Sequence, residues 1–534
     1  MISCWIASSF ERVYRNSYPK PNRYCRLDLG QGDRGSFQAC IRNGTLTSRT
    51  VDVECSSDVL DVKVRRVGYV PVPHLNTETP LDQLDGLGQI PGFVPDPLFW
   101  DLTGSLEPEE TRSFWVTVKT PRDCSPGVYS LVFRFRLDDG EEYTVEACVV
   151  VHPVTLEKRK DFPVTHWFYT DALCDWYGVN PFDEGFWRIV KPYIEDLVEH
   201  GTNVLHTPLF TPPTDGVKRP TQLLAIRRDG DRYEFDWSQV KRWVDLARTC
   251  GVEYFEWPHL FSQWGVTNAI RIYENYDGQY EDRLLWPPET GADSEVYRNF
   301  LSQFLPAFKA FLDAEGLVDS SFFHLSDEPH GEEHLANYRK ARAILKELAP
   351  WMKVMDAVSE VAFAESGLTD MPVASILTSL EFYHRGIPRW DYFCCVPRGN
   401  FLNRLVDTPL AKIRGAGWLF YRFESRGFLH WGYNYWYKRA TTQLIDPYTV
   451  LSAHAWPNWP YGDTFVVYPG SDGPISSLRW EVFGESLNDY ALLQTLGIPV
   501  DSPQLRGFKG YDDYPKDGQW YQQTRAVLLA TASK

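Results

Sequence analysis

The first 155 residues alternate between apolar and polar positions in short runs that are broken by Gly, Asp, Asn and Pro. Runs such as residues 113–119 and 127–137 place apolar side chains at every second position. This period is that of a strand with one buried face, and many such strands are typical of an antiparallel β-sandwich. We therefore predict an N-terminal β-sandwich domain over residues 1–158, which ends in a charged linker at 156–163.

Beyond the linker, apolar runs alternate with amphipathic helical segments, as in βα units that build a parallel sheet. The predicted strands are 165–169, 203–206, 253–257, 321–326, 353–357, 374–379, 390–395 and 427–433, and the clearest predicted helices are 187–200, 237–250, 294–314 and 332–348. Eight such units predict a (β/α)8 TIM-barrel catalytic domain over residues 159–500. The alternative is a doubly wound sheet, but no glycine-rich fingerprint follows the first strand.

The end of the chain adds a few further elements to the barrel. Residues 462–470 predict a strand or hairpin, and residues 476–496 predict a closing helix. We expect residues 501–534 to form a C-terminal extension packed on the barrel, with a helix over 513–532.

Composition narrows the class of protein. The chain has 534 residues, 43% of them hydrophobic and 23% charged, and no run of about 18 apolar residues, so disorder and membrane insertion are excluded. The formal net charge of −17 repels phosphate backbones and anionic lipids, which excludes nucleic acid and membranes as partners. The 20 Trp and 29 Tyr have flat apolar faces with polar edges that suit sugar rings.

The cysteines and the N-terminus bear on the compartment. The ten cysteines show no metal-type spacing, since Cys394 and Cys395 are adjacent and the others are far apart. No basic region followed by an apolar stretch opens the chain. We therefore expect a cytoplasmic protein with free thiols and no zinc site.

Two consecutive carboxylates carry the clearest chemical signal. Asp327 and Glu328 follow the fourth predicted strand directly and precede Pro329. The carboxyl ends of barrel strands form the mouth where active sites lie. Taken alone, two acidic residues before a helix are more often an N-terminal cap, but their position after a buried strand favours catalysis.

Adjacency also bears on mechanism. Most glycosidases place their two carboxylates on opposite sides of the glycosidic bond, about 5–9.5 Å apart, which neighbouring residues do poorly. Neighbouring side chains on a strand diverge. One can therefore face the leaving group while the other holds an acetamido substituent that itself attacks the anomeric carbon, a recognised exception to the two-carboxylate rule.

At these residues the chain resembles glycoside hydrolase family 123. The resemblance rests on Asp327-Glu328, on the stretch 427–436, and on the pattern of 462–470, 477–481 and 488–490. Known members of that family are β-N-acetylgalactosaminidases with an N-terminal β-sandwich and a catalytic barrel. The resemblance implies that Glu328 is the general acid/base and that Asp327 stabilises the acetamido group and its oxazolinium intermediate.

Other predicted strand ends carry aromatic and polar side chains that could bind a monosaccharide, because hydroxyls need directional partners and C–H faces suit indoles. Any single histidine among them is more often structural than a ligand. The candidate substrate-binding residues are His166, His206, Trp257, His259, Tyr383, Trp431, Asn434, Trp436 and Asp463, accompanied by Trp167 and His384.

The sequence thus predicts a retaining exo-glycosidase that needs no cofactor and removes a terminal β-linked N-acetylhexosamine, with N-acetylgalactosamine favoured, from an oligosaccharide or glycoconjugate. Three alternatives remain. One is a glycosidase of the same fold acting on a different sugar. The second is a metal-dependent sugar isomerase, suggested by His324, Asp327, Glu328, His330 and His334, although no second acidic cluster completes a coordination sphere. The third is a non-catalytic carbohydrate-binding protein.

Overall fold

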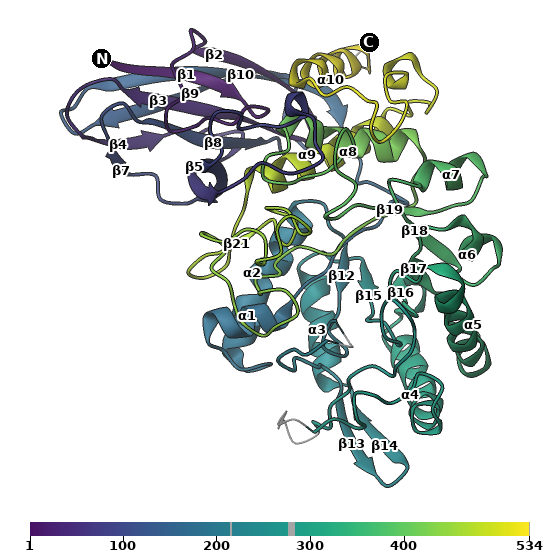
Figure 1. Ribbon diagram of the computed structural model, residues 1–534. Helices are drawn as coiled ribbons and strands as arrows, with labels where there is room; N and C mark the ends of the chain where they lie inside the picture. Colours follow the sequence, from purple (N-terminus) through teal and green to yellow (C-terminus); the bar gives the residue numbers. More distant parts are fainter. Residues whose placement is uncertain (214–215, 276–282, 533–534) are drawn as a thin grey trace.

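A β-sandwich forms the N-terminal part of the protein (Figure 1) in a computed structural model that describes residues 1–213, 216–275 and 283–532. One sheet has the order β1 (Ile2–Ser8), β3 (Arg34–Asn43), β8 (Thr111–Lys119), β5 (Asp61–Val72) and β6 (Gly92–Phe99). The other has the order β2 (Tyr24–Gln31), β10 (Glu142–Thr155), β9 (Gly127–Leu137), β4 (Arg49–Glu54) and β7 (Gly104–Leu106). The predicted sandwich is confirmed.

The sandwich is antiparallel except at one place. β2 and β10 pair in parallel, whereas the other pairings within the two sheets are antiparallel. Along β9 the side chains alternate between buried and exposed, with Leu131, Phe133 and Phe135 inside. This alternation is the one that the sequence pattern predicts, because successive side chains of a strand point to opposite faces.

Eight short parallel strands form the barrel, as predicted. Their order around it is β16 (Ser321–Phe322), β15 (Tyr254–Glu256), β12 (Val204–His206), β11 (Val164–His166), β20 (Phe428–His430), β19 (Trp390–Tyr392), β18 (Met371–Ser375) and β17 (Met355–Ala357). A parallel bridge between Phe323 and Val354 joins the two ends of this sheet. One predicted strand was misplaced: β18 covers Met371–Ser375, so of the predicted 374–379 only the first two residues are strand, 376–378 form a turn and Ser379 begins α7.

Helices surround the barrel on its outside (Figure 1). They are α1 (Thr170–Tyr177), α2 (Glu184–Glu199), α3 (Ser238–Thr249), α4 (Glu295–Ala314), α5 (Gly331–Leu348), α6 (Val361–Glu365), α7 (Ser379–His384), α8 (Leu410–Arg422) and α9 (Leu478–Thr495). The sequence pattern predicted α2, α3, α4, α5 and α9 within a few residues. It missed α1, α6 and α7, which are short, and α8, which is almost entirely buried and so lacks the polar stripe that marks an amphipathic helix.

The remaining elements are small. Two hairpins pair β13 (Ala225–Asp229) with β14 (Arg232–Asp236) and β21 (Tyr468–Pro469) with β22 (Pro474–Ile475), so the predicted hairpin near 462–470 is present in short form. Three single-turn helices are Leu81–Gln83, Val318–Ser320 and Pro503–Leu505. None of the helices in the described part of the chain is both long and apolar enough to cross a membrane.

Buried ion pairs join the sandwich to the barrel. Asp96 on β6 accepts hydrogen bonds from Arg479 on α9, and neither side chain is exposed. Beside them, Glu481 accepts hydrogen bonds from Arg34 and Arg65 of the sandwich. Although burial opposes its charge, these cations and His200 keep the pKa of Glu481 well below its usual range. The two parts therefore share one charged core.

The last helix, α10 (Gly518–Ala532), packs against β2 and β10 as well as against α8; residues 533–534 of the predicted extension lie outside the described part. Arg525 on this helix donates to Asp33 of the sandwich and to Asp489 of α9. In Figure 1 the yellow helix lies next to the purple sandwich strands. The extension thus packs on both domains, whereas the prediction from the sequence was that it packs on the barrel alone.

Candidate active site

The two consecutive carboxylates lie at the mouth of the barrel, in the segment between β16 and α5. Asp327 is 9% exposed and Glu328 is half-buried. Glu328 has a backbone φ of 44°, in the left-handed region that non-glycine residues rarely adopt. Such strain persists where the surrounding structure holds it, and it is common at functional sites.

Two aromatic side chains contact the Glu328 carboxylate. The Tyr392 hydroxyl, at the end of β19, donates to Oε1 across 2.9 Å. The Trp264 indole Nε1 lies 3.4 Å from Oε2. Burial, with the negative charge of Glu328, raises the pKa of Tyr392 well above its usual range, so Tyr392 remains a donor over the working pH range of an enzyme. Glu328 is therefore held from two sides.

The chain after β15 runs alongside the chain that leads to Asp327. Four backbone N–H groups of the first segment donate to carbonyls of the second, in the pairs Trp257 to Phe322, Leu260 to His324, Phe261 to Leu325 and Trp264 to Asp327. This ladder extends the pairing of β15 with β16 beyond the strands themselves. It fixes Trp264 beside the two carboxylates.

Beneath the pair, Glu256 lies in the barrel interior with no exposed surface. Its Oε1 accepts hydrogen bonds from Trp167 Nε1 at 2.9 Å and from His324 Nε2 at 2.7 Å, while Thr165 donates to Oε2. Burial favours the neutral acid, but the hydrogen bond from His324 and the nearby positive charges lower the pKa of Glu256. Glu256 is thus an ionised, fully bonded carboxylate.

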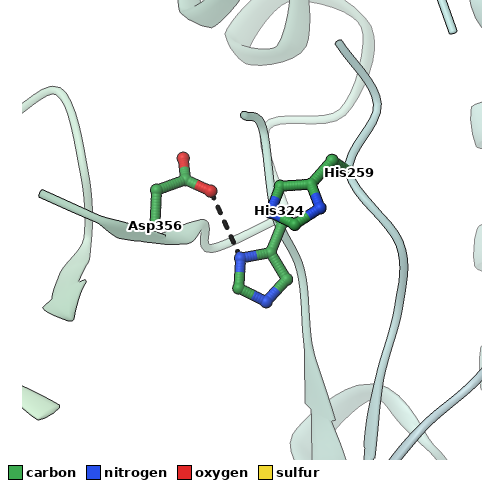
Figure 2. Close-up of side chains that lie close together, drawn as sticks. All are labelled: His259, His324 and Asp356. Carbon is green, nitrogen blue, oxygen red and sulfur yellow. Dashed lines mark hydrogen bonds and ion pairs between the residues drawn. The ribbon is translucent and has the colours of Figure 1, made fainter. Parts of the chain in front are cut away.

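His324 lies between two carboxylates. Its Nε2 contacts Glu256, and its Nδ1 lies 3.3 Å from Oδ1 of Asp356 (Figure 2). Burial opposes the charge, yet hydrogen bonds to Asp356 and Glu256 raise the pKa of His324 to about 10. Asp356 also accepts from Tyr338 and from the Leu325 backbone. The result is a buried network of two anions around an imidazolium.

The metal interpretation can be tested on this cluster. His259, His324 and Asp356 have potential ligand atoms within 4.8 Å of one another (Figure 2). A protonated imidazole offers no lone pair to a metal, and both nitrogens of His324 already donate to carboxylates. The cluster fits a charge network better than a metal site.

A small hollow opens beside this network. Its walls are Trp167, Tyr169, His206, Pro212, Pro213, His259, Phe261 and Gln263. Three buried nitrogen atoms here have no hydrogen-bond partner among the described residues. They are both ring nitrogens of His206 and the Nε2 of His259. Burial lowers the pKa of His206 to about 4 and that of His259 well below its usual value. The neutral His206 therefore offers one donor and one acceptor to a polar ligand, and the neutral His259 offers its Nε2.

A second polar group follows β20. Trp431 Nε1 donates to Oδ2 of Asp463 at 3.1 Å, and His430 Nε2 lies 3.8 Å from Oδ1. Burial raises the pKa of Asp463 to about 7, against the hydrogen bond from Trp431 and the charge of Arg404. Tyr169 connects this group to the hollow, because its hydroxyl donates to the Trp431 carbonyl at 3.0 Å.

The structure therefore brings His206, His259, Trp431 and Asp463 to the mouth with Asp327 and Glu328. It places four of the other five candidates away from the mouth, and the fifth, Asn434, bonds the backbone of Tyr169. The His166 imidazole lies on the outer side of β11, between Thr202 and Arg404, and packs against Trp480 of α9. Trp257 contacts Phe308 of α4. Tyr383, with His384, lies on α7 against Phe423.

Asn434 and Trp436 are structural as well. The Asn434 side chain accepts from the Tyr169 backbone N–H and donates to its carbonyl, which ties two mouth loops together. Trp436 is buried, with its Nε1 donating to the carbonyl of Val467. Because strands here are only about three residues long, the residue just past each predicted end turns inward or outward according to a register that the pattern does not fix.

Three residues of the site were missed. Glu256 and Tyr392 lie within predicted strands. Because residues two apart in a strand share a face, each would be expected on the same face as the residues two positions away. A carboxylate inside an apolar strand was the available signal for Glu256. Trp264 lies in a loop, and no local pattern distinguishes it from the other tryptophans.

An eight-stranded parallel barrel with carboxylates and indoles at the carboxyl ends of its strands is an architecture of enzymes that act on carbohydrates. The model of the family described as "Glycoside hydrolase 123, catalytic domain" matches residues 167–496. The chain belongs to this family, and it is a glycoside hydrolase whose substrate is a carbohydrate. No curated protein sequence matches the chain significantly.

A solved structure of the same family shares the fold. A family 123 glycoside hydrolase from Clostridium perfringens, whose structure gave details of glycolipid glycan hydrolysis, has a TM-score of 0.72 at 14% identity, with 100% of this chain and 97% of that chain covered. A xyloglucanase from Bacteroides ovatus, solved with a heptasaccharide, has a TM-score of only 0.32 at 10% identity, with 91% and 100% covered. The first similarity supports the sandwich-and-barrel architecture.

Proposed function

We propose that the protein is a retaining exo-glycosidase that removes a terminal β-linked N-acetylhexosamine, with N-acetylgalactosamine favoured, by substrate-assisted catalysis. The observation that carries this proposal is the adjacency of Asp327 and Glu328 in the segment between β16 and α5. Of the carboxylates nearby, Glu256 and Asp356 bind His324, and the buried Asp463 accepts from Trp431 through Oδ2.

In the proposed mechanism, Glu328 donates a proton to the glycosidic oxygen while the acetamido carbonyl oxygen attacks the anomeric carbon. The bond to the leaving group breaks and an oxazolinium ring forms. Asp327 accepts a hydrogen bond from the acetamido N–H and offsets the positive charge that develops there. Glu328, now a carboxylate, takes a proton from water, which attacks the anomeric carbon and restores the original configuration.

The contacts of the mouth support this division of roles. Tyr392 and Trp264 bond the Glu328 carboxylate and hold it in place. Because Glu328 is only half-buried, a leaving group can reach it. Asp327 is more deeply buried, and with Asp463 it contributes to raising the pKa of Tyr169, after burial itself. Asp327 therefore lies near Tyr169, a wall of the hollow, and we propose that the terminal sugar lies there with the neutral His206 and His259 as partners for its hydroxyls.

The source of the sugar is also part of the proposal. The similar enzyme from Clostridium perfringens is described by its hydrolysis of glycolipid glycans, and we propose a glycoconjugate or oligosaccharide as the substrate here. We place the protein in the cytoplasm, since all ten cysteines are free, as thiols are in a reducing compartment.

The test is a panel of para-nitrophenyl β-glycosides assayed with the full-length protein. It contains N-acetylgalactosaminide, N-acetylglucosaminide, galactoside and glucoside. We expect turnover of the N-acetylated sugars alone, with the galacto form faster, and a β-configured product by NMR at early times. Faster hydrolysis of galactoside than of N-acetylgalactosaminide would overturn the proposal, and a matched Glu328→Gln preparation controls for contaminating hydrolases.

A further inference from the structure

Trp264 combines an exposed indole with a strained backbone. Its side chain is 48% exposed, although its backbone pairs with the buried Asp327. Trp264 has a backbone φ of 59° and Val266 has one of 56°. This conformation is costly for non-glycine residues, above all for a β-branched one, and it persists only where the surrounding structure imposes it.

Backbone hydrogen bonds at Trp264 and at the next residue, Gly265, anchor the loop that carries the indole. The Trp264 N–H donates to the Asp327 carbonyl at 2.9 Å, and the next carbonyl, of Gly265, accepts from Asn337 Nδ2 of α5 at 3.0 Å. The two ends of the loop are joined by a further hydrogen bond. The Asn268 N–H donates to Ser262 Oγ at 3.0 Å. The indole is thus held out toward solvent by a fixed backbone.

The indole also contacts the proposed acid. Trp264 Nε1 lies 3.4 Å from Oε2 of Glu328, while Tyr392 occupies Oε1. A general acid must reach the glycosidic oxygen within about 3 Å in the bound state. The group that departs therefore lies next to Glu328, whose Oε2 contacts the exposed indole.

We infer that Trp264 is the platform of a leaving-group subsite, on which the C–H face of a second sugar ring stacks. The inference rests on the proposed function and deepens it by assigning a specificity-determining residue: Trp264 would select β-glycosides whose leaving group is a pyranose. An indole offers an apolar face to the ring carbons and a polar edge. A bound ring covers the exposed indole, which favours saccharide over alkyl leaving groups.

The experiment compares Trp264→Ala with Trp264→Phe on two substrates. One is the disaccharide with N-acetylgalactosamine β-linked to galactose, and the other is methyl β-N-acetylgalactosaminide, which has the same glycon and no second ring. Both variants lose the contact of the indole N–H with Glu328, and only the Phe variant keeps an aromatic face. Trp100→Ala, at an indole that is 57% exposed on the sandwich, is the matched control.

We expect Trp264→Ala to lower kcat/KM for the disaccharide roughly tenfold more than for the methyl glycoside, since about 1.4 kcal/mol corresponds to a factor of ten. Trp264→Phe should retain most of the disaccharide preference, and Trp100→Ala should change neither substrate. A thermal melt of each variant confirms that it folds.

Two failures are distinguishable. If Trp264→Ala loses the same factor on both substrates, or if Ala and Phe behave alike, the indole acts on Glu328 and the platform is overturned. If the wild-type protein hydrolyses neither substrate and instead turns over glycosides without an acetamido group, the proposed function is wrong and the inference falls with it.

Discussion

Tyr392 donates its hydroxyl hydrogen bond to Oε1 of Glu328 across 2.9 Å, from a strand separated from β16 by β17 and β18. The closed barrel thus orients a residue of its own active site, because a donor on one strand holds a carboxylate that follows another strand. Tyr392 also lies 3.4 Å from the hydroxyl of Ser359. Its orientation is therefore defined before any substrate arrives.

Replacing Tyr392 by Phe should lower kcat about 10- to 100-fold, since a hydrogen bond to a charged group contributes roughly 1.5–3 kcal/mol. KM should change little, because the hydroxyl acts through Glu328. The measurement is a double-mutant cycle with Glu328→Gln. Additive losses in that cycle would show that Tyr392 acts independently of Glu328.

Glu328→Gln removes the proposed proton donor without changing the size of the side chain. We expect kcat/KM to fall roughly 10²–10⁴-fold for a disaccharide. The loss should shrink for a dinitrophenyl leaving group, which departs without a proton. Steady-state rates over a series of leaving groups test this. An equal loss across the series would contradict general-acid catalysis by Glu328.

Asp327→Asn keeps the shape of the side chain but removes its charge. Turnover should fall by about 10²–10³-fold, because an oriented charge that stabilises the forming oxazolinium acts in the transition state. KM should change much less. Kinetics of the variant on the preferred aryl glycoside give both parameters, and a change confined to KM would mark Asp327 as an ordinary binding contact.

A thiazoline analogue of N-acetylgalactosamine should bind far more tightly than the free sugar, because it resembles the proposed cyclic intermediate. Its inhibition constant against the full-length protein is the measurement. The matched control is the analogue of the substrate with a hydroxyl in place of the acetamido group, which should be almost inert. Trapping of a covalent adduct on Asp327 by a fluoro sugar, seen by mass spectrometry, would establish an enzyme nucleophile instead.

The His324 network makes stability depend on pH. Since the pKa of His324 is raised to about 10 from an ordinary value near 6.5, its contribution is complete below about pH 6.5 and declines as pH rises toward 10. Glu256, Asp356, His206 and His259 face this imidazole. Chemical unfolding from pH 6 to 10 should show a decline that is shallower in His324→Gln by up to about 1.4 kcal/mol per pH unit.

His200 gives the control for that experiment. Its pKa is also raised, to about 9, by Asp196 and Glu481 against its burial. A His200→Gln variant should therefore remove a separate part of the same decline. Equal pH profiles for the wild type and His324→Gln would mean that His324 is not charged in the folded protein.

Much of the architecture was predictable because it rests on periodicity. The alternation along residues 127–137 and the helical stripes of 187–200 and 294–314 each determine one element. The buried helix α8 was not predictable from the sequence, because a helix that is buried on every side shows no periodic alternation of apolar and polar residues. The strand near 374 was shifted for a related reason, as a short apolar run fits several registers.

The site was predictable where its residues are adjacent in sequence and unpredictable where they meet only in space. Asp327 and Glu328 stand together after a strand, and the chain order alone exposes them. Trp264 and Tyr392 reach Glu328 from other walls, through a loop ladder and a strand face that only the closed barrel defines. His166 and Trp257 were expected in the mouth, yet their strands turn these side chains toward α9 and α4.

The buried pairs between the sandwich and the barrel set a lower limit on any working fragment. A gene cut at the linker would separate Arg479 from Asp96, Glu481 from Arg34 and Arg65, and Arg525 from Asp33. His200 and Asp489 would remain beside Glu481 and Arg525, whereas Arg479 would lose its carboxylate partner, and removing one partner of a buried pair costs about 3–5 kcal/mol. The segment that carries the family likeness is therefore shorter than the segment able to fold. Chimeras with related glycosidases should exchange both domains as one cassette.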